Sequence, residues 1–365
     1  MDKLDEIRKR INSLDAQMAS LFEERMLQCR QVAQFKREHA LSITDSAREA
    51  EVIAKNSSLI KDDSIREYYA RFQKGLMDTS KAYQSRIMEG MRVAYCGVPG
   101  AFAHIAAKHM FPEAELVPFS NFEDTYRSCE NNQTDCAVLP IENSFAGDVA
   151  NVMDLMFAGS LYVNQVVEIA AVQNLLGCEG TTRESIREVV SHPQAISQCS
   201  AFIRKNGYSV NEFPNTAMAA RYVAEKKDPS IAAIASLESA ELFGLKLIEP
   251  HINSSSTNTT RFAAFSRSRC TENAKAKMGR HFILTFTVKN EAGALAKTLN
   301  IIGAHGFNMC SLKSRPMKEL MWNYYFYMEL DGDVQTEDGQ DMLHALGSVC
   351  DRLKLVGSFT SQKNG

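Results

Sequence analysis

Two cationic side chains, Arg25 and Lys36, occupy positions where the spacing of the N-terminal residues calls for apolar ones. Apolar residues recur three and four apart before them, which predicts the buried face of an α-helix. Arg25 continues that spacing, and Lys36 falls about 20° from it around a helix of 3.6 residues per turn. Cations on such a face predict a pocket for a dianion, and a charged helical hairpin with solvated arginines is the alternative. The apolar positions are Leu4, Ile7, Ile11, Leu14, Met18 and Leu21.

A second group of polar side chains follows apolar runs between residues 91 and 270. Such short runs predict buried strands. Polar side chains at the carboxyl ends of parallel strands meet where open α/β sheets bind ligands, so we expect a cleft there. For the last set, a loop of hydroxyl residues capping its own backbone is the alternative. The three sets are Glu142, Asn143 and Ser144; Ser191, Gln194 and Gln198; and Thr259, Thr260 and Arg261.

The composition excludes several classes of protein. A net charge of −3 over 365 residues gives no basic field for nucleic acid. No apolar run approaches the ~18 residues of a membrane span, and the first residues lack the apolar core of a signal peptide. Gly97 and Gly100 make a GxxG turn rather than a dinucleotide fingerprint, and nine cysteines without a CxxC pair predict reduced thiols. We therefore expect a cytoplasmic enzyme for small molecules, with no cofactor and no metal.

Three compositions along the chain predict three units that position these residues. Residues 1–90 contain no proline and predict an all-helical unit, with helix starts at capping boxes headed by Ser46 and Ser64. Residues 91–270 alternate apolar runs with helical stretches, which predicts an α/β unit with a mostly parallel sheet. After a polar linker at 266–277, residues 279–365 predict an α+β unit of order β-α-β-β-α-β. Its expected elements are 281–288, 294–305, 308–315, 322–330, 337–350 and 354–360.

The charged residues of the helical unit resemble, in order and spacing, the active-site pattern of the all-helical chorismate mutases. That family converts chorismate to prephenate by a pericyclic shift, which needs positioning and charge stabilisation rather than a nucleophile. The resemblance implies that Asp45, Arg48 and Glu49 hold the ring hydroxyl and orient one another. The matching residues are Arg8, Arg25, Lys36, Asp45, Arg48, Glu49 and, after one deletion, Ser80 and Gln84.

The same resemblance implies that Arg8 and Arg25 bind the two carboxylates, and that Lys36 and Gln84 donate to the ether oxygen. Arg8 and Arg25 are 17 residues apart on one presumed helix, hence about 25 Å apart. One small ligand cannot touch both. We therefore expect a homodimer or a higher homo-oligomer in which Arg8 comes from the second chain.

The α/β region, from about residue 91 to 267, resembles prephenate dehydratase through PIENS, SHPQAISQC and TRF in this order. That family implies two α/β lobes with a cleft between them, like a periplasmic binding protein, and the conversion of prephenate to phenylpyruvate. Thr260 would protonate the departing hydroxide, and Arg261 would bind a substrate carboxylate. Asn143, Ser144, Ser191 and Gln198 would line the cleft.

The last unit resembles the ACT domain, a regulatory module with a ferredoxin-like fold that binds amino acids. The resemblance implies a phenylalanine site on Gly293, Ala294, Leu295, Asn308 and Ser314. Lys313 stands where the family has a glutamate. A lysine near the ammonium of phenylalanine would repel it, whereas a lysine that points away would leave the affinity intact. We expect weakened yet measurable inhibition. A dimerisation domain without a ligand is the alternative.

Together these features predict a bifunctional enzyme of phenylalanine biosynthesis, with chorismate mutase at 1–90, prephenate dehydratase at 91–270 and an ACT domain at 279–365. Chorismate and prephenate would be its substrates and phenylalanine its effector. Two alternatives remain open: a dehydratase that prefers arogenate, and a non-catalytic two-lobed binding module fused to a mutase.

Overall fold

The computed structural model describes residues 2–39, 41–254, 258–269, 280–317 and 323–363. It divides into two compact units, Met1–Arg92 and Val93–Gly365. Trp322, the expected start of a strand, and part of the predicted linker lie outside the described residues. No helix in the described ranges has the length and apolar character needed to cross a membrane.

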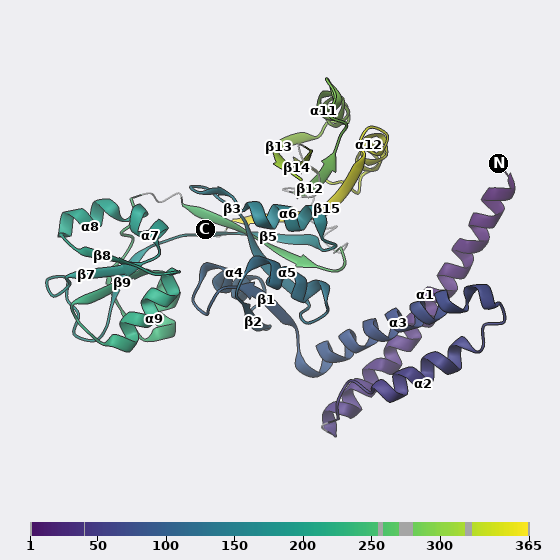
Figure 1. Cartoon of the computed structure of the whole chain (residues 1–365), viewed down its shortest axis with the longest axis horizontal. Helices are drawn as coiled ribbons and strands as arrows, with labels where there is room; N and C mark the ends of the chain where they lie inside the picture. Colours follow the sequence, from purple (N-terminus) through teal and green to yellow (C-terminus); the bar gives the residue numbers. More distant parts are fainter. Residues whose placement is uncertain (1, 40, 255–257, 270–279, 318–322, 364–365) are drawn as a thin grey trace. The chain divides into compact units, whose positions relative to one another are not determined.

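Three helices form the first unit: α1 (Asp2–Glu38), α2 (Ser46–Ser57) and α3 (Asp63–Glu89). The all-helical prediction is confirmed. Both α1 and α2 pack against α3, whereas the N-terminal half of α1 extends beyond them (Figure 1). Its apolar stripe is accordingly half-exposed or more, with Leu4 at 53% and Leu21 at 65%. The periodicity is helical as expected, but α2 and α3 do not cover this half of the stripe.

Aspartates, and not the predicted serines, start the second and third helices. Asp45 accepts a hydrogen bond from the backbone N–H of Arg48 at 3.0 Å, and Asp62 accepts one from that of Ser64 at 2.9 Å. The capping boxes predicted at Ser46 and Ser64 are therefore wrong. An aspartate just upstream of each serine already satisfies a first-turn N–H, so each helix begins earlier than the serine would dictate.

The first sheet of the second unit has the strand order β13-β14-β12-β15-β5-β11-β3-β1-β2, with β4 paired to β3. The prediction of a mostly parallel sheet is wrong. β1 pairs with β3 in parallel, but β11 lies antiparallel between β3 and β5 because it brings the chain back from the second sheet. On the flanks of β1, β3 and β5 lie α4 (Phe102–Met110), α5 (Phe122–Glu130) and α6 (Ala150–Ala158). The strands are β1 (Arg92–Cys96), β2 (Glu115–Phe119), β3 (Cys136–Asn143), β4 (Gly147–Asp148), β5 (Tyr162–Ala170), β11 (Thr259–Ser266), β12 (Arg280–Thr287), β13 (Asn308–Pro316), β14 (Tyr324–Asp331) and β15 (Arg352–Lys363).

The second sheet forms a separate lobe with the strand order β10-β6-β9-β7-β8. The chain enters this lobe after β5 and leaves it before β11, so two crossings join the lobes (Figure 1). Its elements are β6 (Asn174–Gly177), β7 (Glu188–Ser191), α7 (Pro193–Gln198), α8 (Ser200–Asn206), β8 (Ser209–Glu212), α9 (Thr216–Lys226), β9 (Ile231–Ala235), α10 (Leu237–Phe243) and β10 (Lys246–Glu249).

The C-terminal part follows the predicted β-α-β-β-α-β order, with α11 (Ala294–Ala304) and α12 (Glu337–Gly347) between its strands. It does not stand apart from the first lobe, since β15 pairs antiparallel with β12 and parallel with β5. A Cβ atom on Gly357 of β15 would lie 1.9 Å from the carbonyl oxygen of Val163 on β5. Only glycine allows the two backbones to approach this closely. Tyr327 and Phe359 share one apolar core with the first lobe.

Candidate active sites in the two units

A pocket of about 330 Å³ lies among the three helices of the first unit. It brings together seven of the eight side chains that the sequence predicted here. α1 supplies Arg25 and Lys36, the loop before α2 supplies Asp45, and the other four come from α2 and α3. Its lining is Arg25, Cys29, Val32, Lys36, Ile43, Asp45, Arg48, Glu49, Val52, Met77, Ser80, Lys81 and Gln84.

The polar groups of this helical pocket are held by neighbours. Arg25 donates to the hydroxyl of Ser80, and the Lys36 ammonium donates to the carbonyl oxygen of Ile43 at 2.8 Å. Gln84 is 8% exposed, and its Oε1 is buried without a hydrogen-bond partner in the described part of the chain. A buried polar atom of this kind costs free energy unless something in the pocket satisfies it.

One lining cation, Lys81, was not predicted. Its ammonium lies 3.0 Å from carboxylate oxygens of both Glu49 and Asp78. Hydrogen bonds to Asp78 and Glu49 raise the pKa of Lys81. The available signal was its position three residues before Gln84, which places both side chains on one face of a helix.

The expectation that Asp45, Arg48 and Glu49 orient one another is wrong. The Asp45 carboxylate caps α2, the guanidinium of Arg48 lies 3.7 Å from Glu51, and Glu49 pairs with Lys81. Arg48 and Glu49 are adjacent in sequence, so their side chains point in different directions from the helix, and the Asp45 carboxylate is used by the backbone of the first turn.

Arg8 lies outside the helical pocket. Its side chain is 68% exposed and lies 3.9 Å from Asp5 on the same helix. The 17 residues between Arg8 and Arg25 on α1 correspond to about 25 Å along the helix axis.

The second unit contains a pocket of about 390 Å³ between its two lobes. The turn from β3 through β4 to the start of α6 forms most of it, β11 contributes Thr260, and the second lobe contributes Gln194 from α7. Its volume falls in the ~300–1,000 Å³ range of small-molecule sites. The lining is Pro140, Asn143, Ala146, Gly147, Asp148, Val149, Ala150, Asn151, Gln194 and Thr260.

A hydrogen-bond network fixes the hydroxyl of Thr260 in this interlobe pocket. The Asn143 amide donates to Thr260 Oγ1 at 2.8 Å and to Asn258 Oδ1 at 2.9 Å. The Asn143 oxygen accepts from the backbone N–H groups of Phe145 and Ala146 at 3.0 and 2.8 Å, which fixes the orientation of the amide. Thr260 and Asn143 are direct cross-strand partners of β11 and β3. Because Asn143 donates to Thr260, the threonine proton stays available to a ligand.

Three of the predicted cleft residues have other roles in the structure. Ser191 is fully buried and donates to the carbonyl oxygen of Ile234 at 2.6 Å. Ser144 accepts from the backbone N–H of Thr259 at 2.9 Å and so closes the end of β3 onto β11. Gln198 does not line the pocket; Gln194, one helical turn earlier on α7, takes its place. Ser191 and Ser144 use their hydroxyls on backbone groups, and Gln198 Oε1 is buried without a hydrogen-bond partner in the described part of the chain.

Arg261 faces away from the interlobe pocket. Its guanidinium binds both carboxylate oxygens of Glu329 on β14, at 2.9 and 2.7 Å, and one of Glu142 at 3.1 Å. Successive side chains of a strand point to opposite faces, so Thr260 and Arg261 cannot both face one ligand, and the expected carboxylate contact is wrong. Burial would lower the pKa of Arg261, but the Glu329 carboxylate outweighs burial and raises it.

Lys313 also faces the first lobe. Its ammonium binds Glu142 at 2.9 Å and pairs with Asp148, which lines the interlobe pocket. Burial would raise the pKa of Glu142, but Lys313 and Arg261 together hold it below its usual value. Two carboxylates already neutralise the charge of Lys313, and weakened inhibition by phenylalanine stays a prediction.

The residues expected to bind phenylalanine fall at opposite ends of the C-terminal sheet. Gly293, at φ +83°, precedes the first turn of α11 without a side-chain cap, and Ala294 is 9% exposed. Asn308 begins β13 and donates to Asp331 at 2.9 Å. Ser314 lies six residues further along that strand, or about 20 Å from Asn308. One phenylalanine cannot contact both ends within one copy of the chain.

Comparison with known proteins matches each unit to a family. Residues 93–270 match the family of prephenate dehydratase, and residues 7–85 match chorismate mutase type II. The bifunctional chorismate mutase/prephenate dehydratase of Neisseria gonorrhoeae is 29% identical over 355 residues, which are 96% of this chain and 95% of that protein. The arogenate dehydratase/prephenate dehydratase 2 of Arabidopsis thaliana is 30% identical over 278 residues, 74% of this chain and 72% of the plant protein.

Solved structures resemble the second unit. The prephenate dehydratase of Staphylococcus aureus superposes with a TM-score of 0.65 at 25% identity and covers 74% of this chain and 100% of that one. GqqA, described as a novel type of quorum quenching acylase, superposes with a TM-score of 0.68 at 28% identity, over 74% of this chain and 98% of that one.

Proposed function

The chain belongs to the family of bifunctional chorismate mutase/prephenate dehydratases, and we propose which of its side chains carry out the two reactions. It is an enzyme of phenylalanine biosynthesis. Its helical unit is the chorismate mutase, which makes prephenate, and its α/β unit is the prephenate dehydratase, which makes phenylpyruvate. A cytoplasmic location, expected from its cysteines, is part of the proposal.

Arg25, Lys36 and Gln84 stabilise the rearranging chorismate. Arg25 binds a carboxylate through its planar fork, with Ser80 fixing the guanidinium. Lys36 and the amide N–H of Gln84 donate to the ether oxygen, where negative charge develops as the C–O bond breaks. The buried Oε1 of Gln84 is an acceptor without a hydrogen-bond partner in the described part of the chain, and it supports a polar ligand that also carries a donor, such as a ring hydroxyl. Four charged side chains surround the ring hydroxyl: Asp45, Arg48, Glu49 and Lys81.

Arg8 binds the second carboxylate from another copy of the chain. Its distance from Arg25 rules out one pocket within one chain, and the half-exposed stripe from Leu4 to Leu21 needs a cover. The same stripe of a second α1 is apolar and of equal length. We assign the helical unit to a homodimer with two shared pockets.

Thr260 protonates the hydroxyl that leaves prephenate. Loss of carbon dioxide supplies the electron pair that aromatises the ring, and the departing hydroxide takes the threonine proton to leave as water. A threonine hydroxyl is a weak acid, so its orientation by Asn143 is the observation that carries this assignment.

The start of α6 binds a carboxylate of prephenate in place of Arg261. Val149, Ala150 and Asn151 all line the interlobe pocket, and Val149 precedes the helix without a side-chain oxygen for its first N–H groups. Unpaired N–H groups at a helix N-terminus attract anions. Gln194 adds a hydrogen-bonding group from the opposite lobe.

The C-terminal part is an ACT domain that senses phenylalanine between two copies of the chain. Each site takes residues from two copies: Gly293, Ala294 and Leu295 from one, and Asn308 from the other. Both copies are needed because about 20 Å of β13 separates Asn308 from the opposite end of the sheet, where α11 starts. Phenylalanine thereby lowers dehydratase activity.

Separate assays of the two reactions test this assignment. The purified chain is given chorismate, prephenate or arogenate, and the loss of chorismate and the formation of phenylpyruvate or phenylalanine are measured. We expect turnover of chorismate and prephenate, with Arg25→Ala losing only the first and Thr260→Val only the second. Faster turnover of arogenate than of prephenate would reassign the dehydratase substrate. A single substitution that removes both activities would contradict two independent sites.

A further inference from the structure

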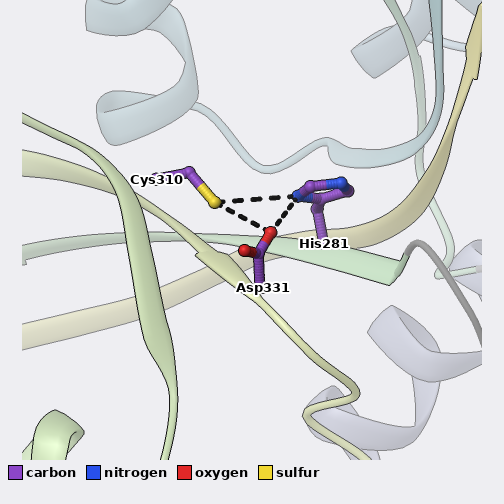
Figure 2. A group of neighbouring side chains, drawn as sticks. All are labelled: His281, Cys310 and Asp331. Atoms are coloured by element: carbon purple, nitrogen blue, oxygen red, sulfur yellow. Dashed lines mark hydrogen bonds and ion pairs between the residues drawn. The ribbon is translucent and has the colours of Figure 1, made fainter.

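Three side chains of different chemistry converge on the C-terminal sheet, outside both pockets described above. His281 comes from β12, Cys310 from β13 and Asp331 from β14 (Figure 2). His281 Nδ1 lies 2.9 Å from Asp331 Oδ1, and Cys310 Sγ lies 2.8 Å from the same oxygen and 4.0 Å from the imidazole nitrogen. Neither reaction assigned to this enzyme uses them.

The pairing of the strands brings the three together. His281 and Asp331 are direct cross-strand partners, and Asn308 is the partner of Asp331 on the other side. The register between β13 and β14 shifts between Met309 and Ser311, which leaves Cys310 as the extra residue of a bulge. Bulges redirect a side chain relative to a regular strand, and here the sulfur meets Asp331.

We propose that His281, Cys310 and Asp331 bind a zinc ion, with its fourth position open to water. Imidazole nitrogen, thiolate sulfur and carboxylate oxygen are the zinc ligands of proteins, at about 2.0–2.3 Å each. Tetrahedral bonds of those lengths put ligand atoms about 3.3–3.8 Å apart. The three observed separations, 2.8, 2.9 and 4.0 Å, bracket that range, so shifts of under about 1 Å complete the site.

The choice of zinc over other cations follows from the donors. Mg²⁺ and Ca²⁺ prefer oxygen ligands, whereas a thiolate and an imidazole select softer ions. The residues lie on three strands and are separated by 29 and 21 residues, so no short sequence motif marks them. The sequence-based expectation that the chain has no metal depended on the absence of such a motif.

Zinc binding at this site replaces existing hydrogen bonds. Without metal, the Cys310 thiol donates to Asp331, whose other oxygen accepts from Asn308 at 2.9 Å. The metal takes the sulfur lone pair, and the thiol proton goes to solvent. The neighbouring carboxylate of Glu329 remains committed to Arg261 and is not a ligand. Asn308 continues to hold Asp331 as an outer-sphere partner.

Titration of the full-length chain tests the site. The protein is stripped with a chelator, and zinc is added in competition with a chromophoric chelator, with Mg²⁺ and Ca²⁺ as comparison ions. Cys310→Ala and His281→Ala remove a ligand each. Cys350→Ala, in the same part of the chain but outside the cluster, is the matched control. Co²⁺ then serves as a spectroscopic probe, since a thiolate ligand gives it a charge-transfer band.

The expected result is one zinc per chain in the parent and in Cys350→Ala, and affinity at least tenfold weaker in Cys310→Ala and His281→Ala. Zinc should raise the Tm of the parent but not that of Cys310→Ala, whose dehydratase activity reports that its second unit is folded. Equal zinc affinity in the parent and Cys310→Ala, or zinc binding lost in Cys350→Ala, would overturn the proposal. If Cys310→Ala fails to fold, a cobalt spectrum of the parent without a thiolate band would overturn it and leave only a hydrogen-bonded triad.

Discussion

At the scale of single residues, the dehydratase depends on the direction in which one proton points. Asn143 is locked by two backbone N–H groups, donates to Thr260, and leaves that hydroxyl with its own proton free for the pocket. Valine has nearly the shape of threonine, but its methyl group neither accepts from Asn143 nor carries a proton to give.

Thr260→Val should lower dehydratase kcat by roughly 10²–10⁴, the usual contribution of a positioned general acid. KM for prephenate should change far less, because the carboxylate contacts remain. Steady-state formation of phenylpyruvate measures both. Thr259→Val, the neighbouring position of the same strand, is the control and should stay within a few-fold of the parent. Turnover of Thr260→Val within that same range would identify another acid.

At the scale of elements, side chains on the two faces of β11 have different roles. One face presents Thr260 to the interlobe pocket, and the other uses Arg261 to join β3 and β14 through Glu142 and Glu329. Lys313 on β13 joins the same cluster through Glu142. The strand that carries the proposed catalytic hydroxyl is therefore held in place by the C-terminal part of its own chain.

Glu329→Gln should destabilise the second unit, because Glu329 is 4% exposed on its side chain and its loss leaves Arg261 with Glu142 alone. Breaking a buried pair of this kind costs about 3 kcal/mol. Denaturant unfolding measures the change, and dehydratase kcat should fall while mutase activity remains. Glu337→Gln, at the exposed start of α12, is the control. Unchanged stability would show that Arg261 does not need its bidentate partner.

The ion pair of Lys313 with Glu142 should be pH-dependent. Lys313 and Arg261 lower the folded-state pKa of Glu142, so this stabilisation is complete above the unfolded pKa and is lost as the pH falls through the folded value. The loss in unfolding free energy caused by Lys313→Met should therefore be largest near neutral pH and shrink below pH 4.5. Unfolding curves from pH 7 to pH 3.5 measure it. A constant difference would assign the effect to packing of the lysine stem.

Features set by local sequence patterns could be predicted, whereas contacts between residues far apart in the chain could not. Helical spacing predicted that Arg25 and Lys36 share one face of α1, and both line the helical pocket. Gln84 lies on α3 and was expected there only from the family resemblance. Because successive side chains of a strand point to opposite faces, Thr260 and Arg261 are expected to point apart. The TRF motif contains both residues and so suggests, wrongly, that they face the same ligand. The partners of Arg261 and Lys313 lie 68 and 171 residues away in the chain, and no local pattern specifies them.

At the scale of the whole molecule, the proposed assembly has a second copy complete a part of each unit. The stripe on α1 is half-exposed or more, Arg8 lies about 25 Å along α1 from Arg25, and the two ends of the C-terminal sheet are too far apart to meet one ligand. In this proposal, mutase catalysis in the helical unit and inhibition by phenylalanine in the C-terminal part both require two copies of the chain.

Arg8→Ala and Arg25→Ala should each abolish mutase activity, and a mixture of the two should recover it. In a hybrid dimer one of the two shared pockets regains both arginines, so random exchange should restore about a quarter of the parent activity. Chorismate consumption after subunit exchange measures this. Dehydratase activity of each variant is the internal control. Failure to recover activity in subunits shown to exchange would reject shared pockets.

Phenylalanine should bind the parent and Lys313→Met with affinities within about twofold, because Lys313 points to the first lobe and not to the effector site. Inhibition of the dehydratase should be weaker in Lys313→Met, since the variant removes a link between the C-terminal sheet and Glu142. Calorimetry measures binding and phenylpyruvate formation measures inhibition. Loss of binding in Lys313→Met would place the lysine in the effector site after all, and no binding to either protein would make this part an assembly element.

The parallel pairing of β5 with β15 also bears on how the chain is made. Val163 of β5 leaves the ribosome long before Gly357, its partner on the last strand. Through that interval β5 is an unpaired sheet edge of a nascent chain, with backbone groups that can pair with another polypeptide. The first lobe can therefore close its sheet only after β15 has left the ribosome. Cells that produce this enzyme rapidly should place its unfinished chains among the substrates of ribosome-bound chaperones.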